Sequence, residues 1–116
     1  MLKKIAETEA KKINNLSCIF VSDEKIFEMN QKYLNHDYYT DIITFNYSMS
    51  NTLINGEMYI SINTVKLNAN EYNVHFDIEL LRVIIHGLLH LCGYKDDTEK
   101  QMKKMRKKET FYINLL

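Results

Sequence analysis

A chain of 116 residues, 46% of them hydrophobic and 26% charged, has the length and composition of a single globular domain. Fifteen basic residues balance fifteen acidic ones, so the net charge predicts no general attraction to nucleic acid, and we expect no DNA partner. No apolar run approaches the about 20 residues that span a bilayer, and the N-terminal MLKKIAETEAKK is too charged for a signal peptide, so we expect a cytoplasmic protein without a membrane partner.

The first part of the chain predicts a helix, a strand and a second helix. Residues 2–15 place apolar side chains at helical spacing between lysines and glutamates, which is typical of an amphipathic helix. The short apolar segment 17–21 (SCIFV) is rich in strand formers. Ser22 or Asp23 can then cap a helix that extends to about Asn35. Asn35 and Asp37 flank His36 and favour a turn.

The rest of the chain predicts two strands and three helices. Residues 41–48 and 57–62 are β-rich, and a polar stretch separates them, so they can pair as neighbours. Helices are predicted at 63–72, 76–92 and 98–114, and the last begins with a threonine and a glutamine at capping-box spacing. This order of elements predicts an α+β (mixed α/β) fold in which helices cover a small sheet.

The helix predicted at 76–92 is apolar around most of its circumference, which indicates burial on nearly every side. Its polar side chains gather on one narrow stripe that contains Glu79, Arg82, His86 and His90, with Gly93 continuing the line.

Two residues of this stripe, His86 and His90, have the spacing of metal ligands. Side chains at positions i and i+4 stack on consecutive helical turns, where two imidazoles can bind one ion. A third ligand requires the chain to turn back, and Gly93 can adopt the left-handed conformation that ends a helix. Asp96 and Asp97 follow, and the spacing HxxxHxxGxxD favours Asp96. The sequence therefore predicts a zinc-type catalytic site of His86, His90 and Asp96, at the C-terminal end of the buried central helix.

This spacing is similar to the HExxHxxGxxH pattern of metzincin proteases. Residue 87 is glycine, however, where those proteases carry their general-base glutamate. A protease is therefore disfavoured. Other metal-dependent hydrolases are not, because three protein ligands and an open fourth position activate water without that glutamate.

Three blocks of the sequence resemble one family. Residues 86–97 read HGLLHLCGYKDD, which is similar to HGxLHLxGYDH, the signature of the YbeY family of single-domain bacterial metal-dependent endoribonucleases. Upstream of it, TDIITF at 40–45 resembles the family's TDVLSF, and GEMYIS at 56–61 resembles its GDIxIs segment. Asn30 precedes these blocks, and all of them occur in the family's order.

The resemblance implies one metal-dependent endoribonuclease domain over residues 1–116, on a small mixed sheet that we expect to have four strands. It implies a zinc ion bound by His86, His90 and Asp96, and cleavage of single-stranded regions of ribosomal RNA. The implied roles are maturation of the small-subunit rRNA 3′ end and ribosome quality control, with the small ribosomal subunit as partner. Either water activated by the metal or the RNA 2′-hydroxyl is the nucleophile.

Two positions depart from the family pattern. Asp96 stands where the family usually has histidine; a carboxylate can bind zinc, but it is a harder and more negative ligand, so the metal is less defined. Leu34 stands where the family usually has an arginine that is thought to meet the RNA phosphate. Arg82 can replace it, which makes Arg82, His86 and His90 the expected catalytic residues; the alternative for Arg82 is a salt bridge with Glu79.

A basic cluster occurs near the C-terminus, and it contains Lys103, Lys104, Arg106, Lys107 and Lys108. It is either the solvated face of a helix or a patch that attracts RNA.

Two other functions compete with RNA cleavage. A ribosome-associated assembly factor with a structural metal agrees with the neutral net charge and with Leu34, and such a site would have four protein ligands. A metalloprotease requires a base other than residue 87, and casein left uncut by the metal-loaded protein would dispose of it.

Overall fold

The computed structural model describes residues 1–34 and 40–116, which form five helices and three strands. In chain order these are α1 (Leu2–Thr8), β1 (Lys12–Val21), α2 (Asp23–Leu34), β2 (Ile42–Asn46), β3 (Leu53–Ser61), α3 (Ile62–Glu71), α4 (Phe76–Leu91) and α5 (Glu99–Asn114). The predicted turn around His36 lies outside the described residues. No helix in the described ranges combines the length and the apolarity that crossing a bilayer requires.

The three strands form one mixed sheet in the order β1-β3-β2. β1 is parallel to β3, and β2 is antiparallel to β3, so the predicted pairing of the second and third β-rich segments is confirmed. Within residues 1–34 and 40–116 the sheet has three strands, whereas we expected four. The reason is that the chain contains three β-rich segments and each of them forms a single strand, with the additional length going into β1 and β3.

The N-terminal helix is shorter than its apolar spacing predicts. α1 ends at Thr8, and Ala10 has a left-handed backbone with φ 61° that breaks the helical path. The chain then enters β1, where the backbone N–H of Lys12 donates to the carbonyl of Thr52 over 2.8 Å. Ile13, which the helical pattern included, lies instead in β1 opposite Ile54. Hydrogen bonds to a strand about forty residues away therefore override local helix propensity.

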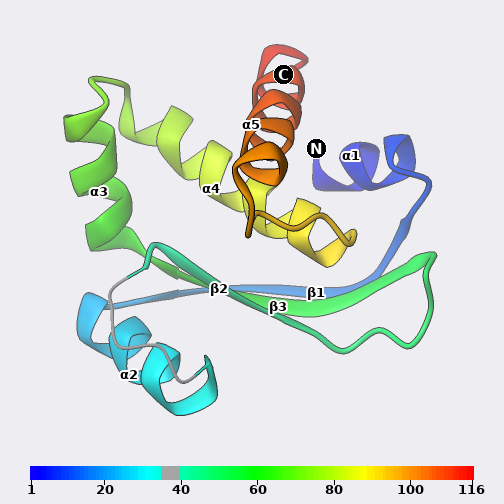
Figure 1. The fold of residues 1–116 in the computed structure, drawn as a ribbon, viewed down its shortest axis with the longest axis horizontal. Helices are drawn as coiled ribbons and strands as arrows, with labels where there is room; N and C mark the ends of the chain where they lie inside the picture. Colours follow the sequence, from blue (N-terminus) through cyan, green and yellow to red (C-terminus); the bar gives the residue numbers. More distant parts are fainter. Residues whose placement is uncertain (35–39) are drawn as a thin grey trace.

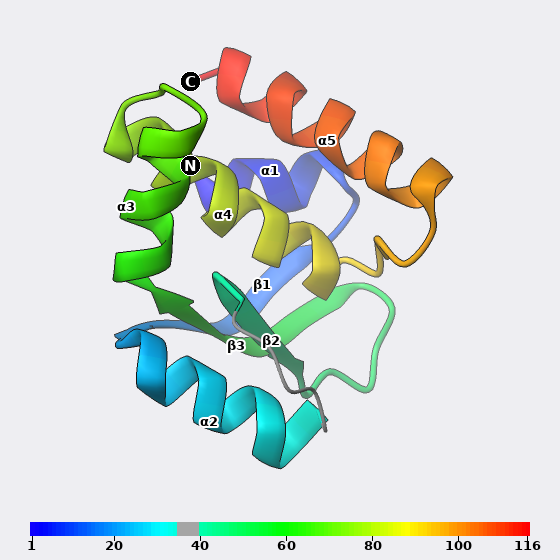
Figure 2. The same cartoon turned by 60° about the vertical axis from the view of Figure 1, so that its left-hand side comes forward.

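The sheet is covered on both faces. α2 lies against one face, and α1, α3, α4 and α5 lie on the other, with α4 crossing the sheet (Figures 1 and 2). The main core lies between the sheet and this second group of helices, and it includes Ile5, Met58, Ile85, Leu88, Leu89 and Tyr112, all of them buried. α4 is thus enclosed by apolar neighbours, as its composition predicts.

Gly87 allows α4 to pack closely against the sheet. A Cβ atom at this position would lie 2.6 Å from the Cδ1 atom of Ile42 and 2.6 Å from the sulfur of Met58. The side of α4 that carries Gly87 therefore faces β2 and β3. The glycine that replaces the protease glutamate in the sequence pattern has a packing function.

Glu9 fixes the segment that follows α4. Its carboxylate accepts hydrogen bonds from the hydroxyls of Tyr94 and Tyr112 and from the ammonium of Lys108, the first at 2.6 Å and the last at 3.0 Å. Burial acts to raise the pKa of Glu9, but these three donors outweigh burial and lower it. The end of α1 thereby holds in place the loop that carries Asp96.

Candidate metal centre

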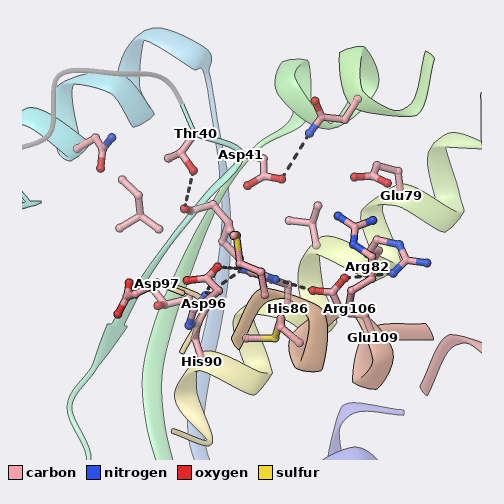
Figure 3. Close-up of a pocket in the computed structure, with 18 of the residues that line it drawn as sticks. Thr40, Asp41, Glu79, Arg82, His86, His90, Asp96, Asp97, Arg106 and Glu109 are labelled. Atoms are coloured by element: carbon pink, nitrogen blue, oxygen red, sulfur yellow. Dashed lines mark hydrogen bonds and ion pairs between the residues drawn. The ribbon is translucent and has the colours of Figure 1, made fainter. Parts of the chain in front are cut away.

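The polar stripe of α4 lines a cleft of about 620 Å³ between α4, α5, the end of α2 and the start of β2. All four stripe residues, Glu79, Arg82, His86 and His90, line it, as the helical spacing predicts (Figure 3). Asp96 and Asp97 approach from the loop after α4, and Glu109 approaches from α5.

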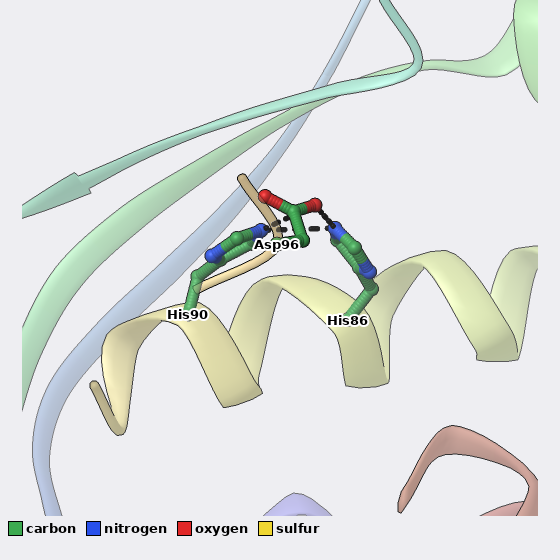
Figure 4. Close-up of side chains that lie close together, drawn as sticks. All are labelled: His86, His90 and Asp96. Atoms are coloured by element: carbon green, nitrogen blue, oxygen red, sulfur yellow. Dashed lines mark hydrogen bonds and ion pairs between the residues drawn. The ribbon is translucent and has the colours of Figure 1, made fainter. Parts of the chain in front are cut away.

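His86, His90 and Asp96 converge inside this cleft (Figure 4). The two Nε2 atoms of the histidines are 2.9 Å apart, and the Asp96 Oδ2 atom is 3.2 Å from His86 Nε2 and 3.3 Å from His90 Nε2. The side chains are 25%, 24% and 35% exposed, so each is partly shielded while remaining open to the cleft. Among the described residues these three are the group of potential ligands whose donor atoms come close enough to share one ion.

The outer nitrogen of each histidine has a hydrogen-bond acceptor. His86 Nδ1 donates to the Glu109 carboxylate over 2.6 Å, and His90 Nδ1 donates to the backbone carbonyl of Tyr94 over 3.0 Å. These bonds assign the Nδ1–H tautomer to both neutral rings, which leaves both Nε2 lone pairs directed at each other and at Asp96. The two Nε2 lone pairs and the Asp96 carboxylate face a common point, and their mutual repulsion requires a cation there. Metal-binding histidines usually donate their other ring N–H to an acceptor, as both histidines do here. The donor set therefore fits a metal ion.

The spacing of the donor atoms fits zinc as well. Two ligand atoms that each lie about 2.0–2.2 Å from a tetrahedral ion are about 3.3–3.6 Å apart. The 3.3 Å from Asp96 to His90 agrees with this spacing, whereas the 3.2 Å from Asp96 to His86 and the 2.9 Å between the histidines are shorter, so these donor atoms have to separate slightly around an ion. The same arrangement attracts a proton: burial lowers the pKa of His86, but the hydrogen bond to Glu109 and the charges of the neighbouring carboxylates outweigh burial and raise it.

The turn after α4 selects Asp96 over Asp97. Gly93 has φ 108°, a left-handed conformation that suits glycine, and it reverses the chain toward the cleft. The predicted capping box is present at the start of α5, where Thr98 and Gln101 bond to each other's backbone N–H groups. The backbone N–H of Asp97 also donates to the Gln101 side chain over 3.0 Å. Asp97 is thus held at the helix start, and Asp96 points to the histidines.

Glu109 is the site residue that the sequence reasoning missed. It lies on α5, its side chain is 5% exposed, and it joins His86 to Arg82, whose Nη1 donates to the Glu109 Oε1 atom over 3.1 Å. Arg82 therefore pairs with Glu109 and not with Glu79, the partner that sequence spacing suggested. A signal existed in the sequence: Glu109 shares one stripe with Met105 and Tyr112, and an acid among buried apolar positions requires a partner.

This contact makes Glu109 a positioning residue whose effect is measurable. Replacement Glu109→Gln keeps the shape but removes the charge that holds the His86 ring, and we expect zinc affinity to fall about 10–100-fold. Competition with a chromophoric chelator measures it. Glu99→Gln removes the same charge from an exposed position in the first turn of α5 and serves as control. Equal zinc affinities for the two variants would contradict a role for Glu109.

Two further acids line the cleft without forming part of the ligand group. Burial raises the pKa of Asp41, whose Oδ2 atom accepts a hydrogen bond from Asn68 over 3.5 Å. Burial likewise raises the pKa of Glu79, and the charge of Asp41 adds to that rise. Both carboxyl groups thus hold protons to higher pH than exposed acids do. Leu34, at the position of the family's arginine, also lines the cleft.

Comparison with known proteins places this chain in a family. The family model described as "Endoribonuclease YbeY" matches residues 1–116. The chain belongs to the YbeY family. A relative from Christiangramia forsetii named "Endoribonuclease YbeY" is 50% identical over 114 residues, which are 98% of this chain and 79% of that protein. Another of the same name, from Parabacteroides distasonis, is 47% identical over 115 residues, or 99% of this chain and 80% of that protein.

A solved structure shares the fold. The solution structure of TM1509 from Thermotoga maritima has a TM-score of 0.68 and 37% sequence identity to this chain, with 97% of this chain and 73% of that one covered. The resemblance stated from the HGLLHLCGYKDD, TDIITF and GEMYIS blocks is therefore confirmed.

Proposed function

We propose that this protein is a metal-dependent endoribonuclease that cleaves single-stranded RNA, and that residues 1–116 form its one catalytic domain. The observation that carries the proposal is the convergence of His86, His90 and Asp96 in an open cleft of a chain from the YbeY endoribonuclease family. We propose ribosomal RNA as the substrate, maturation of the small-subunit rRNA 3′ end and ribosome quality control as the process, the small ribosomal subunit as partner and the cytoplasm as location.

Zinc is the proposed ion. Two imidazoles and one carboxylate suit it, and three protein ligands in a cleft leave room for a fourth, exchangeable position. When bound there, the ion supplies Lewis acidity at the scissile phosphate.

The protein's own residues hold and orient the reactants. The Glu109 carboxylate and the Tyr94 carbonyl fix the two imidazole rings, and Asp96 completes the ligand set. Arg82 is proposed to orient the phosphate: Glu109 and Thr110 engage its Nη1 atom, and the remaining N–H groups of this cleft-lining guanidinium are available to an anion. The donor atoms of the three proposed ligands already lie within 3.3 Å of one another, which favours a preorganised site.

The depth of the site favours single strands. The proposed ligands are only a quarter to a third exposed, so the scissile phosphate has to enter the cleft. A single strand can bend its backbone inward and splay its bases, whereas a duplex must first unpair.

Cleavage of matched RNA substrates tests the proposal. Protein loaded with zinc is expected to cut a labelled single-stranded RNA internally and to leave the same sequence intact when it is annealed to its complement. Chelator should stop the reaction and added zinc should restore it. Fragments resolved on a denaturing gel provide the measurement, and an intact single strand in the presence of restored zinc would refute the nuclease.

A structural metal in a non-catalytic assembly factor is the alternative. Such a site needs four protein ligands and no access for water. The described residues provide a group of three that lines a cleft, which favours catalysis.

A further inference from the structure

A second guanidinium lies in the cleft beside Arg82. Arg106 projects from α5, and Figure 3 shows it on the same side of the cleft as Glu79, Arg82 and Glu109. Its charge reaches Glu79, as does that of Arg82. This side of the cleft therefore holds two guanidiniums and two carboxylates, next to the proposed ligands His86, His90 and Asp96.

The two arginines differ in what holds them. Arg82 is three-quarters buried and donates to Glu109 over 3.1 Å and to Thr110 over 3.5 Å. Arg106 is exposed, and its guanidinium forms no ion pair or hydrogen bond within residues 1–34 and 40–116. Arg82 is thus fixed by the protein, whereas Arg106 keeps its five N–H donors for a ligand.

The basic cluster of α5 separates into two sides. Lys104 and Lys108 point away from the cleft, with their ammonium groups 5.5 Å and 4.9 Å from the centre of the Tyr94 ring. Arg106 shares the cleft-lining stripe with Met102, Met105 and Glu109. Lys107 lies about 100° further around the helix and does not line the cleft. The basic cluster is therefore neither entirely a solvated face nor one continuous RNA-binding patch. Of its five cations, Arg106 is the one that lines the cleft.

We propose that Arg106 forms a phosphate-binding subsite in the cleft, which holds a phosphodiester of single-stranded RNA adjacent to the phosphate at His86, His90 and Asp96. The inference rests on the proposed RNA substrate. A planar guanidinium donates two parallel hydrogen bonds to phosphate oxygens, which an apolar residue at position 34 cannot do. Arg106 thus adds a second guanidinium to the cleft, beside the one of Arg82.

RNA binding in chelator tests the subsite without interference from cleavage. We compare the full-length wild type with Arg106→Gln and with Lys107→Gln, which removes the same charge from the neighbouring position of α5. Fluorescence anisotropy with a labelled single-stranded oligouridine is measured over a series of salt concentrations. Arg106→Gln is expected to weaken binding about tenfold and to reduce the slope of log affinity against log salt by about 0.7, the value of one lost phosphate contact. Lys107→Gln should change both quantities little.

The outcomes separate this inference from the proposed nuclease. Equal losses for Arg106→Gln and Lys107→Gln, or no measurable RNA binding by the wild type, would overturn the subsite. A wild type that does not cleave RNA, but whose binding depends on Arg106 and not on Lys107, would refute the nuclease and leave the subsite standing. If the protein is a nuclease and Arg106 forms the subsite, Arg106→Gln should raise KM for RNA more than it lowers kcat, because Arg106 contacts a phosphate that does not react.

Discussion

Replacement of His90 by alanine is expected to abolish zinc binding and to lower the rate of RNA cleavage by about 10³-fold or more. Removing a ligand should lower zinc affinity by more than the about 10–100-fold that results when a hydrogen-bond partner of a ligand is removed. A bound metal ion stabilises the charge of the transition state by several kcal/mol, and this contribution is lost without the ion. A loss of about 4 kcal/mol lowers the rate about 10³-fold.

The fold should survive this change. His90 points into the cleft, its side chain is about a quarter exposed, and alanine is the best helix former. Melting curves therefore provide a readout besides activity. Zinc at about 100 times its dissociation constant stabilises the wild type by about 2.7 kcal/mol and should leave the melting temperature of His90→Ala unchanged.

His75→Ala is the matched control. His75 precedes α4 and makes no side-chain capping bond, and it does not line the cleft. We expect it to bind zinc and to cleave RNA like the wild type. A His90→Ala protein that zinc still stabilises, or that cleaves at the rate of the control, would show that the ion is not bound where we propose.

The parts of the site that were predicted from sequence depend on local geometry. His86 and His90 are one helical turn apart, so the period of the helix alone places them together. Gly93 and the spacing to Asp96 define a short turn, and the structure brings Asp96 to the histidines. Glu109 is 23 residues from His86, and nothing local shows that α5 packs its buried stripe against the His86 side of α4.

The same distinction explains the fold. Helices α2, α4 and α5 begin and end close to where capping residues and apolar spacing place them. The first helix and strand were divided wrongly, because residues 12–16 form a strand only when β3 supplies partners for their backbone. Within residues 1–34 and 40–116 the sheet has three strands and not the expected four, because each of the three β-rich segments forms one strand. Local signals predict elements, and contacts distant in sequence decide how far the elements extend.

Introducing the missing protease glutamate, Gly87→Glu, is expected to unfold the protein and not to create a protease. The first side-chain atom alone would lie 2.6 Å from both Ile42 and Met58, and real Cβ atoms essentially never come so close to their neighbours. Overpacking of this kind costs about 1–3 kcal/mol. The rest of the side chain would place a carboxylate between α4 and the sheet without a partner, which costs several kcal/mol more.

The sum approaches the about 5–15 kcal/mol that stabilises a domain, so the cooperative melting transition should be lost or shifted far down. Gly87→Ala should be milder, because Ile42 and Met58 present side-chain ends that can shift and because alanine favours the helix. Ile78→Glu introduces the same residue at an exposed position of α4 and should melt like the wild type. Circular dichroism measures the three variants. If Gly87→Glu melts like Ile78→Glu, then α4 does not pack on the sheet through Gly87. If it also cuts casein, the absence of the glutamate alone had prevented proteolysis.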